Sequence, residues 1–386
     1  MNNTTKFEAI RPFYDSEVQD ALQSIAAHPM MHAIMNFAFP HKTAAECDHM
    51  LHNIHSTHQF QAEIVSNALK RILEESCVEG MTHTGFERLE KDTSYLFISN
   101  HRDIILDTSL LNLTLFHHNL LLTASAIGDN LLKNPFLYTL SKINRNFLVR
   151  RGLPPRELLQ SSTLMSEYIH HLLKNDNRTV WIAQREGRTK DGLDETQAGV
   201  LKMLAIAAPS KNVSEYFKTL RIVPISISYE YDPTDSLKIP ELLAKLNNAP
   251  YVKGENEDFN TLYKGMMGQK KRIHIHAGTI LNSELDPISA IPNANQQTKA
   301  IAQLIDNQIV GNYKIWATNY IALDILNGTN QHTAEYTLSE KDNFINRMAA
   351  RIDMHDPQSV ERFLAMYANP ILHKKRVLEE KLQGAA

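Results

Sequence analysis

A histidine with two nearby carboxylates is the arrangement in this sequence best suited to chemistry. In segment 96–112, LFISNHRDIILDTSLLN, an apolar run ends just before His101, and Asp103 and Asp107 follow the histidine. An imidazole titrates near neutral pH and can act as a general base, provided that a carboxylate fixes its tautomer and stabilises its protonated form. The segment therefore predicts an acid–base pair between His101 and one of the two aspartates.

Basic residues follow two further apolar runs, NFLVRRG at 146–152 and WIAQREGRTKDG at 181–192. A guanidinium can bind a phosphate or carboxylate through two hydrogen bonds, and a glycine allows the backbone to turn sharply beside a ligand. We expect these groups to bind an anionic substrate group, with the glutamate orienting the basic side chains. The residues concerned are Arg150, Arg151, Glu186, Gly187, Arg188 and Lys190.

The elements that position these residues alternate between short β-rich runs and helical stretches. Apolar residues recur every three or four positions between 155 and 174, which is typical of a helix. The alternation predicts an α/β fold with a mostly parallel sheet layered with helices. In such sheets ligands bind at the carboxyl ends of the strands. The β-rich runs are 93–99, 120–127, 146–150, 179–184, 221–229 and 272–277.

Three regions follow from this pattern. Residues 1–90 and 286–386 read as helical, and they flank an α/β domain at 91–285. Pro224 lies inside the run 221–229, which indicates an edge strand, a bulge or a close backbone approach rather than a regular central strand.

Composition restricts the function further. The 386 residues carry a formal net charge of -3, so a dedicated nucleic-acid-binding protein is not expected. Two cysteines cannot form a disulfide framework or a multi-cysteine metal site, and we expect no metal and a reducing, cytoplasmic location. The longest apolar stretch is interrupted by Asn112, His117, His118 and Asn119. Any membrane contact should therefore be peripheral, on the inner face of the membrane.

Taken together, these blocks resemble the glycerolipid acyltransferase superfamily, which includes glycerol-3-phosphate and lysophosphatidate acyltransferases. The family has four motifs in this order: a His with a downstream Asp, a strand ending in basic residues, Glu-Gly followed by Arg, and an apolar strand with a proline. The family usually has four residues between the His and its Asp, whereas five separate His101 from Asp107. Asp103 therefore stays a second candidate. The matching positions are Asn100, His101, Asp107, Phe147, Val149, Arg150, Arg151, Glu186, Gly187, Arg188, Ile222, Val223, Pro224 and Ile225.

The resemblance implies acyl transfer from a thioester, on coenzyme A or acyl carrier protein, to a hydroxyl of a lipid precursor such as glycerol phosphate or a lysophospholipid. His101 would be the base, with Asn100 and Arg102 among the substrate-binding residues. No covalent intermediate and no bound cofactor are implied. Two alternatives stay open: an acyltransferase acting on a lyso-aminolipid, and a lipid-binding scaffold that lost the reaction through the altered His–Asp spacing.

Overall fold

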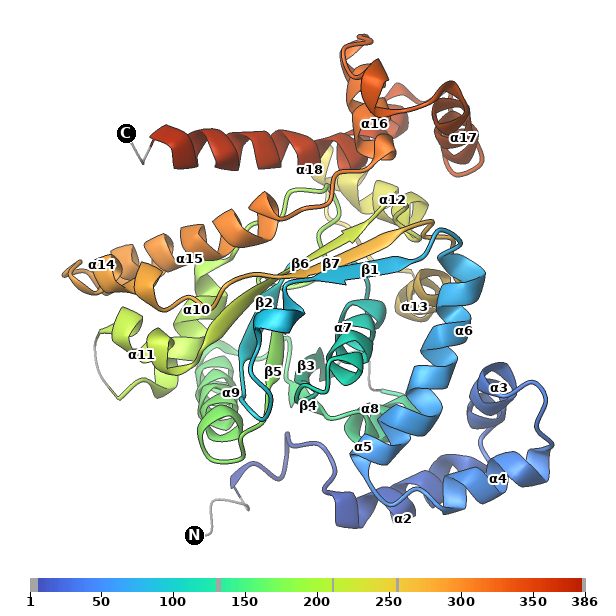
Figure 1. Cartoon of the computed structure of the whole chain (residues 1–386), viewed down its shortest axis with the longest axis vertical. Helices are drawn as coiled ribbons and strands as arrows, with labels where there is room; N and C mark the ends of the chain where they lie inside the picture. The colour runs from blue at the N-terminus through green and yellow to red at the C-terminus, as the bar shows by residue number, and fades with distance from the viewer. Residues whose placement is uncertain (1–5, 130–132, 210–211, 255–256, 384–386) are drawn as a thin grey trace.

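A seven-stranded sheet forms the centre of the molecule, with helices on both faces (Figure 1). The computed structural model describes residues 6–129, 133–209, 212–254 and 257–383. The strand order is β1-β7-β6-β2-β5-β3-β4, and all neighbours pair parallel except β6 with β7. The predicted fold class is confirmed. The strands are β1 (Met81–Thr84), β2 (Leu96–Ser99), β3 (Ala124–Gly128), β4 (Asn146–Val149), β5 (Val180–Ala183), β6 (Ile222–Tyr229) and β7 (Ile273–Ala277).

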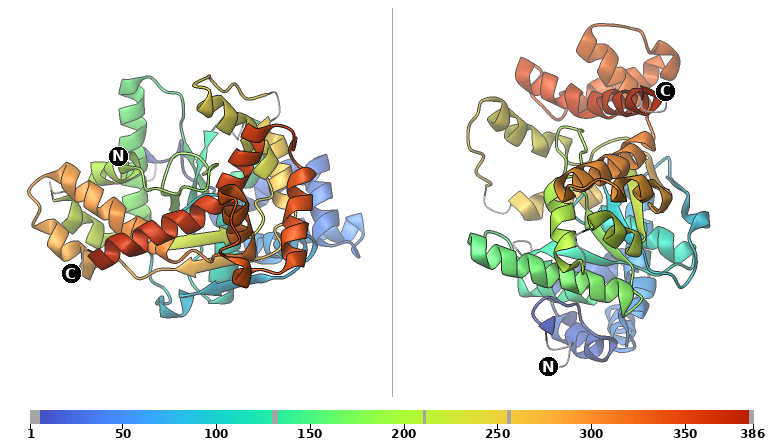
Figure 2. Two further views of the ribbon diagram at one scale, coloured as in Figure 1. Left: turned by 90° about the horizontal axis from the view of Figure 1, so that it is seen from above. Right: turned by 90° about the vertical axis from the view of Figure 1, so that its left-hand side faces the viewer.

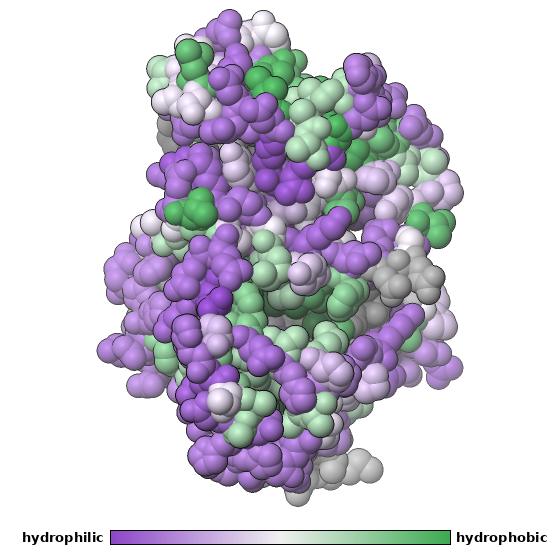
Figure 3. Space-filling view, turned by 90° about the vertical axis from the view of Figure 1, so that its right-hand side faces the viewer, coloured by the Kyte–Doolittle hydropathy of each residue, from purple (hydrophilic) through white to green (hydrophobic). Residues whose placement is uncertain are grey.

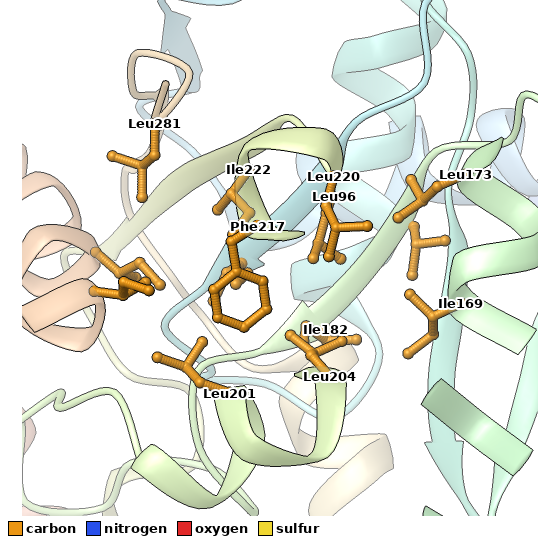
Figure 4. Packing of buried hydrophobic residues seen from close by; sticks show 14 of the residues in the cluster. Leu96, Ile169, Leu173, Ile182, Leu201, Leu204, Phe217, Leu220, Ile222 and Leu281 are labelled. Carbon is orange, nitrogen blue, oxygen red and sulfur yellow. The ribbon is translucent and has the colours of Figure 1, made fainter. Parts of the chain in front are cut away.

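The central strands are apolar along their whole length because helices cover both faces of the sheet. Successive side chains of a strand point to opposite faces. Leu96 of β2 packs against one helical layer, as Figure 4 shows together with Ile182, Ile222 and Phe217, whereas Phe97 packs against the other layer. The first layer contains α9 (Pro155–Lys174), α10 (Ala198–Leu204), α11 (Val213–Thr219) and α15 (Ala294–Gly311), and the second contains α6 (Ser66–Ser76) and α7 (Leu106–His117).

The helices before the sheet form a small apolar cluster of their own. Met31 and Met35 are fully buried in it, together with Phe136 from α8 (Pro135–Ile143). Figure 3 views the side of the molecule on which α3, α4 and α6 lie, and this face is mostly hydrophilic with apolar residues gathered in a central hollow. The helices are α2 (Asp15–Ala26), α3 (Pro29–Ala38), α4 (Ala44–His52) and α5 (Thr57–Phe60), which continues through a π-helical turn (Gln61–Val65) into α6.

The helices after the sheet pack partly on the sheet and partly on one another. α15 contacts β6, and α18 (Pro357–Gln383) contacts α12 (Asp235–Leu246), α15 and α16 (Ala317–Asn327). The boundaries of the three predicted regions, near residues 90 and 285, stay a prediction. Within the described part of the chain, no helix combines the length and apolar composition needed to cross a bilayer. The remaining helices are α13 (Glu257–Met267), α14 (Asp286–Ser289) and α17 (Leu338–Ala349).

β6 is a central strand, between β2 and β7, although it contains Pro224. The expectation of an irregular or edge strand was therefore wrong in part. The antiparallel register with β7 begins at Ile225, and the carbonyl of Pro224 accepts a hydrogen bond from Gly278 N at 2.8 Å. Pro224 thus lies where the chain of β7 stops pairing with β6, so the absence of a proline N–H removes no hydrogen bond from the sheet. The close backbone approach predicted at this proline is the contact with Gly278.

Candidate active site

His101 lies at the edge of the sheet where the parallel strands end. Ser99, the last residue of β2, is in register with Ala183 of β5 and Ile225 of β6. Two residues further on, the His101 carbonyl accepts a hydrogen bond from Thr189 N at 2.9 Å, and the imidazole packs edge-on against Trp181 with 5.5 Å between ring centroids. The imidazole side chain remains 16% exposed. Its backbone is therefore fixed while part of the ring can meet a substrate.

Asp107 is the carboxylate that contacts the imidazole. Its Oδ2 lies 2.8 Å from His101 Nδ1 and also accepts the backbone N–H groups of Arg102, at 2.6 Å, and Asp103, at 3.0 Å. Because a carboxylate oxygen can only accept hydrogen bonds, Nδ1 must carry the ring proton, which leaves Nε2 free to accept one. Asp107 is fully buried in the first turn of α7. The pair thus has the tautomer that a general base needs.

Asp103, the second candidate, caps α7 instead. Its Oδ1 accepts backbone N–H groups from Ile105 at 3.0 Å and Leu106 at 2.9 Å. Burial, and then the neighbouring Asp107 charge, raise the pKa of the Asp103 carboxyl. The loop 102–105 bends around this cap and absorbs the extra residue between His101 and Asp107. The unusual spacing therefore does not prevent the His–Asp contact.

A tyrosine that the sequence did not single out completes the pair. Tyr229, the last residue of β6, donates its hydroxyl to Asp107 Oδ1 at 2.9 Å. Burial and the Asp107 charge raise the pKa of Tyr229 well above its ordinary value, so the hydroxyl stays a donor. Only the register of β6 against β2 brings these residues together, and 122 residues separate them in the chain.

We predict that Tyr229→Phe lowers kcat about tenfold, because the Asp107 carboxylate loses a donor that holds it in position and therefore orients the imidazole less well. Without this donor the carboxylate becomes more basic and stabilises the imidazolium more, so the acidic limb of the pH–rate profile should move to higher pH. Tyr231→Phe is the matched control, since the Tyr231 ring faces Lys271 and Arg347 instead. Equal profiles for both variants would show that Tyr229 does not act through Asp107.

Two residues predicted to bind substrate are engaged elsewhere. Asn100 is fully buried, and its amide donates to the carbonyl of Ile227 at 2.9 Å and accepts from its N–H at 2.8 Å. The Arg102 guanidinium forms an ion pair with the buried Asp194. Asn100 thus joins β2 to β6, and Arg102 anchors the loop that follows β5, while their roles in substrate binding stay a prediction. The sequence could not show this because both partners are far away along the chain.

The loop after β5 carries polar groups that the fold leaves unsatisfied. Gln184 is fully buried, and neither its amide oxygen nor its amide nitrogen has a partner among the described residues. The same holds for Arg185 Nε and Arg188 Nη1. Gly187 adopts a left-handed φ of 71°, which turns the chain between the two arginines. A buried polar atom without a partner is costly, so the donors of this loop, Gln184 Nε2, Arg185 Nε and Arg188 Nη1, are candidates for hydrogen bonds to an anionic ligand.

The predicted residues of this loop separate into two groups. The charge of Arg188 partly offsets the rise in the pKa of Asp103. Thr189, the next residue along the chain, donates its N–H to the His101 carbonyl. Arg185, not predicted, lies two residues beyond the end of β5, as His101 lies two residues beyond the end of β2. In contrast, Lys190 pairs with Glu241 of α12, and the Glu186 side chain is exposed. We therefore retain Arg188 and add Arg185 and Gln184 as ligand-binding candidates.

Arg150 and Arg151 lie apart from this cluster. They follow β4, the strand at the edge of the sheet, which is three strands away from β2. At about 4.8 Å per strand, β4 lies about 14 Å from β2. Both arginines are exposed, and Arg151 N donates to Asp129 Oδ1 at 3.2 Å. The structure thus holds the loop that contains Arg188 against the His101 backbone, through Thr189 N, whereas the arginines after β4 follow a strand three positions away in the sheet.

The C-terminal helices fix the rest of the β5 loop. Asp194 is fully buried and accepts hydrogen bonds from Arg102, Thr189 and Tyr313, the last of which follows α15. Asn369 of α18 donates to the carbonyl of Asp191 at 2.7 Å. The position of the candidate ligand-binding loop therefore depends on residues nearly two hundred positions later.

Asp306 of α15 makes this anchoring sensitive to pH. It accepts the Thr196 N–H at 2.9 Å and the Thr196 hydroxyl at 2.6 Å, and burial raises its pKa to about 7. Between about pH 4 and pH 7 the folded chain keeps a proton that the unfolded chain releases, so stability should fall as pH rises.

Asp306→Asn keeps one acceptor oxygen for Thr196. We expect this variant to lose less unfolding free energy than the wild type when the pH rises, by on the order of 2 kcal/mol. The measurement is the free energy of unfolding at pH 5 and pH 8. The exposed Asp20 provides the control variant Asp20→Asn. An unchanged pH slope in Asp306→Asn would contradict the assignment.

The segment that carries this site matches a known protein family. Residues 80–228 match the model of the family described as Acyltransferase, and this segment includes His101, Asp107 and the β5 loop. Among solved structures, the chain is similar to the crystal structure of the 1-acyl-sn-glycerophosphate (LPA) acyltransferase PlsC from Thermotoga maritima, at 13% identity and a TM-score of 0.37, over 74% of this chain and 91% of that chain. No curated protein matches the chain. Residues 80–228 therefore form an acyltransferase-family domain within this chain.

Proposed function

We propose that this acyltransferase moves a fatty acyl group from a thioester donor to a hydroxyl of an anionic lipid precursor, with His101 as the general base. The observation that carries the proposal is the contact of 2.8 Å between His101 Nδ1 and the fully buried Asp107, at the sheet edge that also carries Arg185 and Arg188. The donor is coenzyme A or acyl carrier protein, and the setting is the cytoplasm or the inner membrane face.

The reaction needs only one proton carrier. His101 Nε2 accepts the proton of the acceptor hydroxyl while the hydroxyl oxygen attacks the thioester carbonyl. Asp107 stabilises the imidazolium that forms. When the carbon–sulfur bond breaks, the imidazolium returns the proton to the leaving thiolate. The acyl group ends on the acceptor oxygen, and no step requires a covalent enzyme intermediate or a cofactor.

The acceptor is expected to carry a phosphate or a carboxylate. Arg185 Nε and Arg188 Nη1 are guanidinium donors without a partner among the described residues, and the unpaired Gln184 amide belongs to the same loop. A phosphate fits glycerol phosphate or a lysophospholipid, whereas a carboxylate fits a lyso-aminolipid. We favour the phosphate because it can accept more hydrogen bonds and takes up the unpaired donors more completely.

The test is thiol release from an acyl thioester in the presence of a panel of acceptors. We expect acceptor-dependent release by the wild type and its loss in His101→Ala. Release at the same rate without any acceptor would indicate a thioesterase instead. No release by the wild type with any acceptor would favour the lipid-binding scaffold, although the spacing that suggested the scaffold no longer argues for it.

A further inference from the structure

Two parts of the chain project beyond the sheet edge that carries His101. The first is the α9 projection, residues 150–161, which begins where β4 ends. The second is the α13 projection, residues 245–254 and 257–263, which belongs to the connection between β6 and β7. Both connections start at the carboxyl ends of parallel strands, and β7 returns antiparallel at the same edge. Both views in Figure 2 show them extending to the same side of the molecule.

The two projections expose large apolar side chains. The exposed fractions are 49% for Leu158, 61% for Leu159, 83% for Val252, 46% for Phe259 and 58% for Tyr263. Apolar side chains scattered singly over a surface need no explanation, but a group on one side that flanks a site indicates an interaction surface.

The α9 projection is also basic. Among residues 150–161, Arg150, Arg151 and Arg156 are opposed only by Glu157. None of the three guanidinium groups has a hydrogen bond or ion pair with any residue that the structure describes, so their charge is available to a partner. The α13 projection is balanced, with three lysines and three acidic residues between 245 and 264. Arginine beside exposed leucine is the combination that binds a bilayer with anionic lipids.

The helix of the α13 projection also packs against the segment that follows His101. Gly265, which follows the projection in α13, packs so closely on the Asp103 carboxylate that a Cβ would not fit. Asp103 in turn caps the helix that carries Asp107. The α13 projection is therefore continuous with a helix that packs on the loop between His101 and Asp107.

The geometry points to these two projections as the surface by which the protein docks on an anionic lipid bilayer, so that the acceptor reaches His101 without crossing water. This inference rests on the proposed function, since it explains how a lipid acceptor arrives. It assigns docking to the α9 and α13 projections rather than to α18. The exposed Leu372 and Leu378 of α18 also flank basic residues, but Lys374 donates to the Tyr313 carbonyl and Arg376 pairs with Glu195.

The test measures co-sedimentation of the full chain with phosphatidylglycerol–phosphatidylcholine vesicles and with pure phosphatidylcholine vesicles. We expect the wild type to prefer the anionic vesicles. Leu158→Ser/Leu159→Ser and Val252→Ser/Phe259→Ser should each lower the partition coefficient at least about tenfold. Arg156→Gln should lower it about fivefold, and only on anionic vesicles. The matched control Leu372→Ser/Leu378→Ser should leave it unchanged.

A second readout separates docking from catalysis. Thiol release with a short-chain, water-soluble donor and acceptor should be unchanged in the leucine variants, whereas release with acceptor embedded in vesicles should fall with the partition coefficient. Loss of vesicle binding in the α18 variant alone, or a wild type that binds no vesicles, would overturn the inference but not the proposed function. If Arg156→Gln leaves vesicle binding unchanged but weakens the use of an acyl carrier protein donor, the arginines bind that carrier instead. This result would also overturn the inference. A wild type that binds vesicles but releases no thiol would instead contradict the proposed function.

Discussion

Asp107→Asn should lower kcat for acceptor-dependent thiol release about a thousandfold. All the partners of the Asp107 carboxylate are donors: His101 Nδ1, two backbone N–H groups and the Tyr229 hydroxyl. An amide can keep the contact with the ring through its oxygen, but it has no negative charge with which to stabilise the imidazolium. Loss of the acidic partner in a His–Asp pair has an effect of about this size or larger.

Asp103→Asn is the matched control for this experiment. It changes the same residue type four positions earlier, and its amide oxygen can still accept the N–H groups of Ile105 and Leu106. Because burial already raises the pKa of the Asp103 carboxyl, a neutral group there should be tolerated. We expect less than about a tenfold loss of kcat. The reverse order of effects would transfer the catalytic role to Asp103.

Asp194→Ala should cost about 3–5 kcal/mol of unfolding free energy, which is typical when one partner of a buried ion pair is removed. The change leaves the Arg102 guanidinium buried without its counter-charge and removes an acceptor from Thr189 and Tyr313. Since Thr189 N is bonded to the His101 carbonyl, the β5 loop should also shift and thiol release should fall. Urea unfolding and the thiol assay measure the two effects.

The double variant Arg102→Leu/Asp194→Leu tests the cause. It removes both charges and keeps apolar volume, so it should recover a substantial part of the lost stability. If the double variant is as unstable as Asp194→Ala, the loss comes from Thr189 and Tyr313 rather than from the unpaired charge. If Asp194→Ala is as stable as the wild type, the proposed anchoring of the loop is wrong.

The sequence determined the fold class and the general place of the site. Helices on both sides of a parallel sheet require unbroken apolar strands, and such runs at 93–99, 179–184 and 221–229 can be read directly. Since the carboxyl ends of parallel strands meet at one edge, the sequence could also place His101 beside the loop that contains Arg188. β1 was missed, because Met81–Thr84 is a short edge strand without an apolar run.

Only the tertiary structure decided which side chains take part. Two aspartates were compatible with the spacing after His101, and the bend at residues 102–105 chose Asp107. Tyr229 and Asp194 contribute because strand register and helix packing bring them to the site from more than ninety residues away. Asn100 and Arg102 have the right chemistry for a ligand, but partners from distant segments satisfy them first. Side-chain type and local spacing limit what a residue can do, whereas its partners are set by long-range packing, which no local pattern encodes.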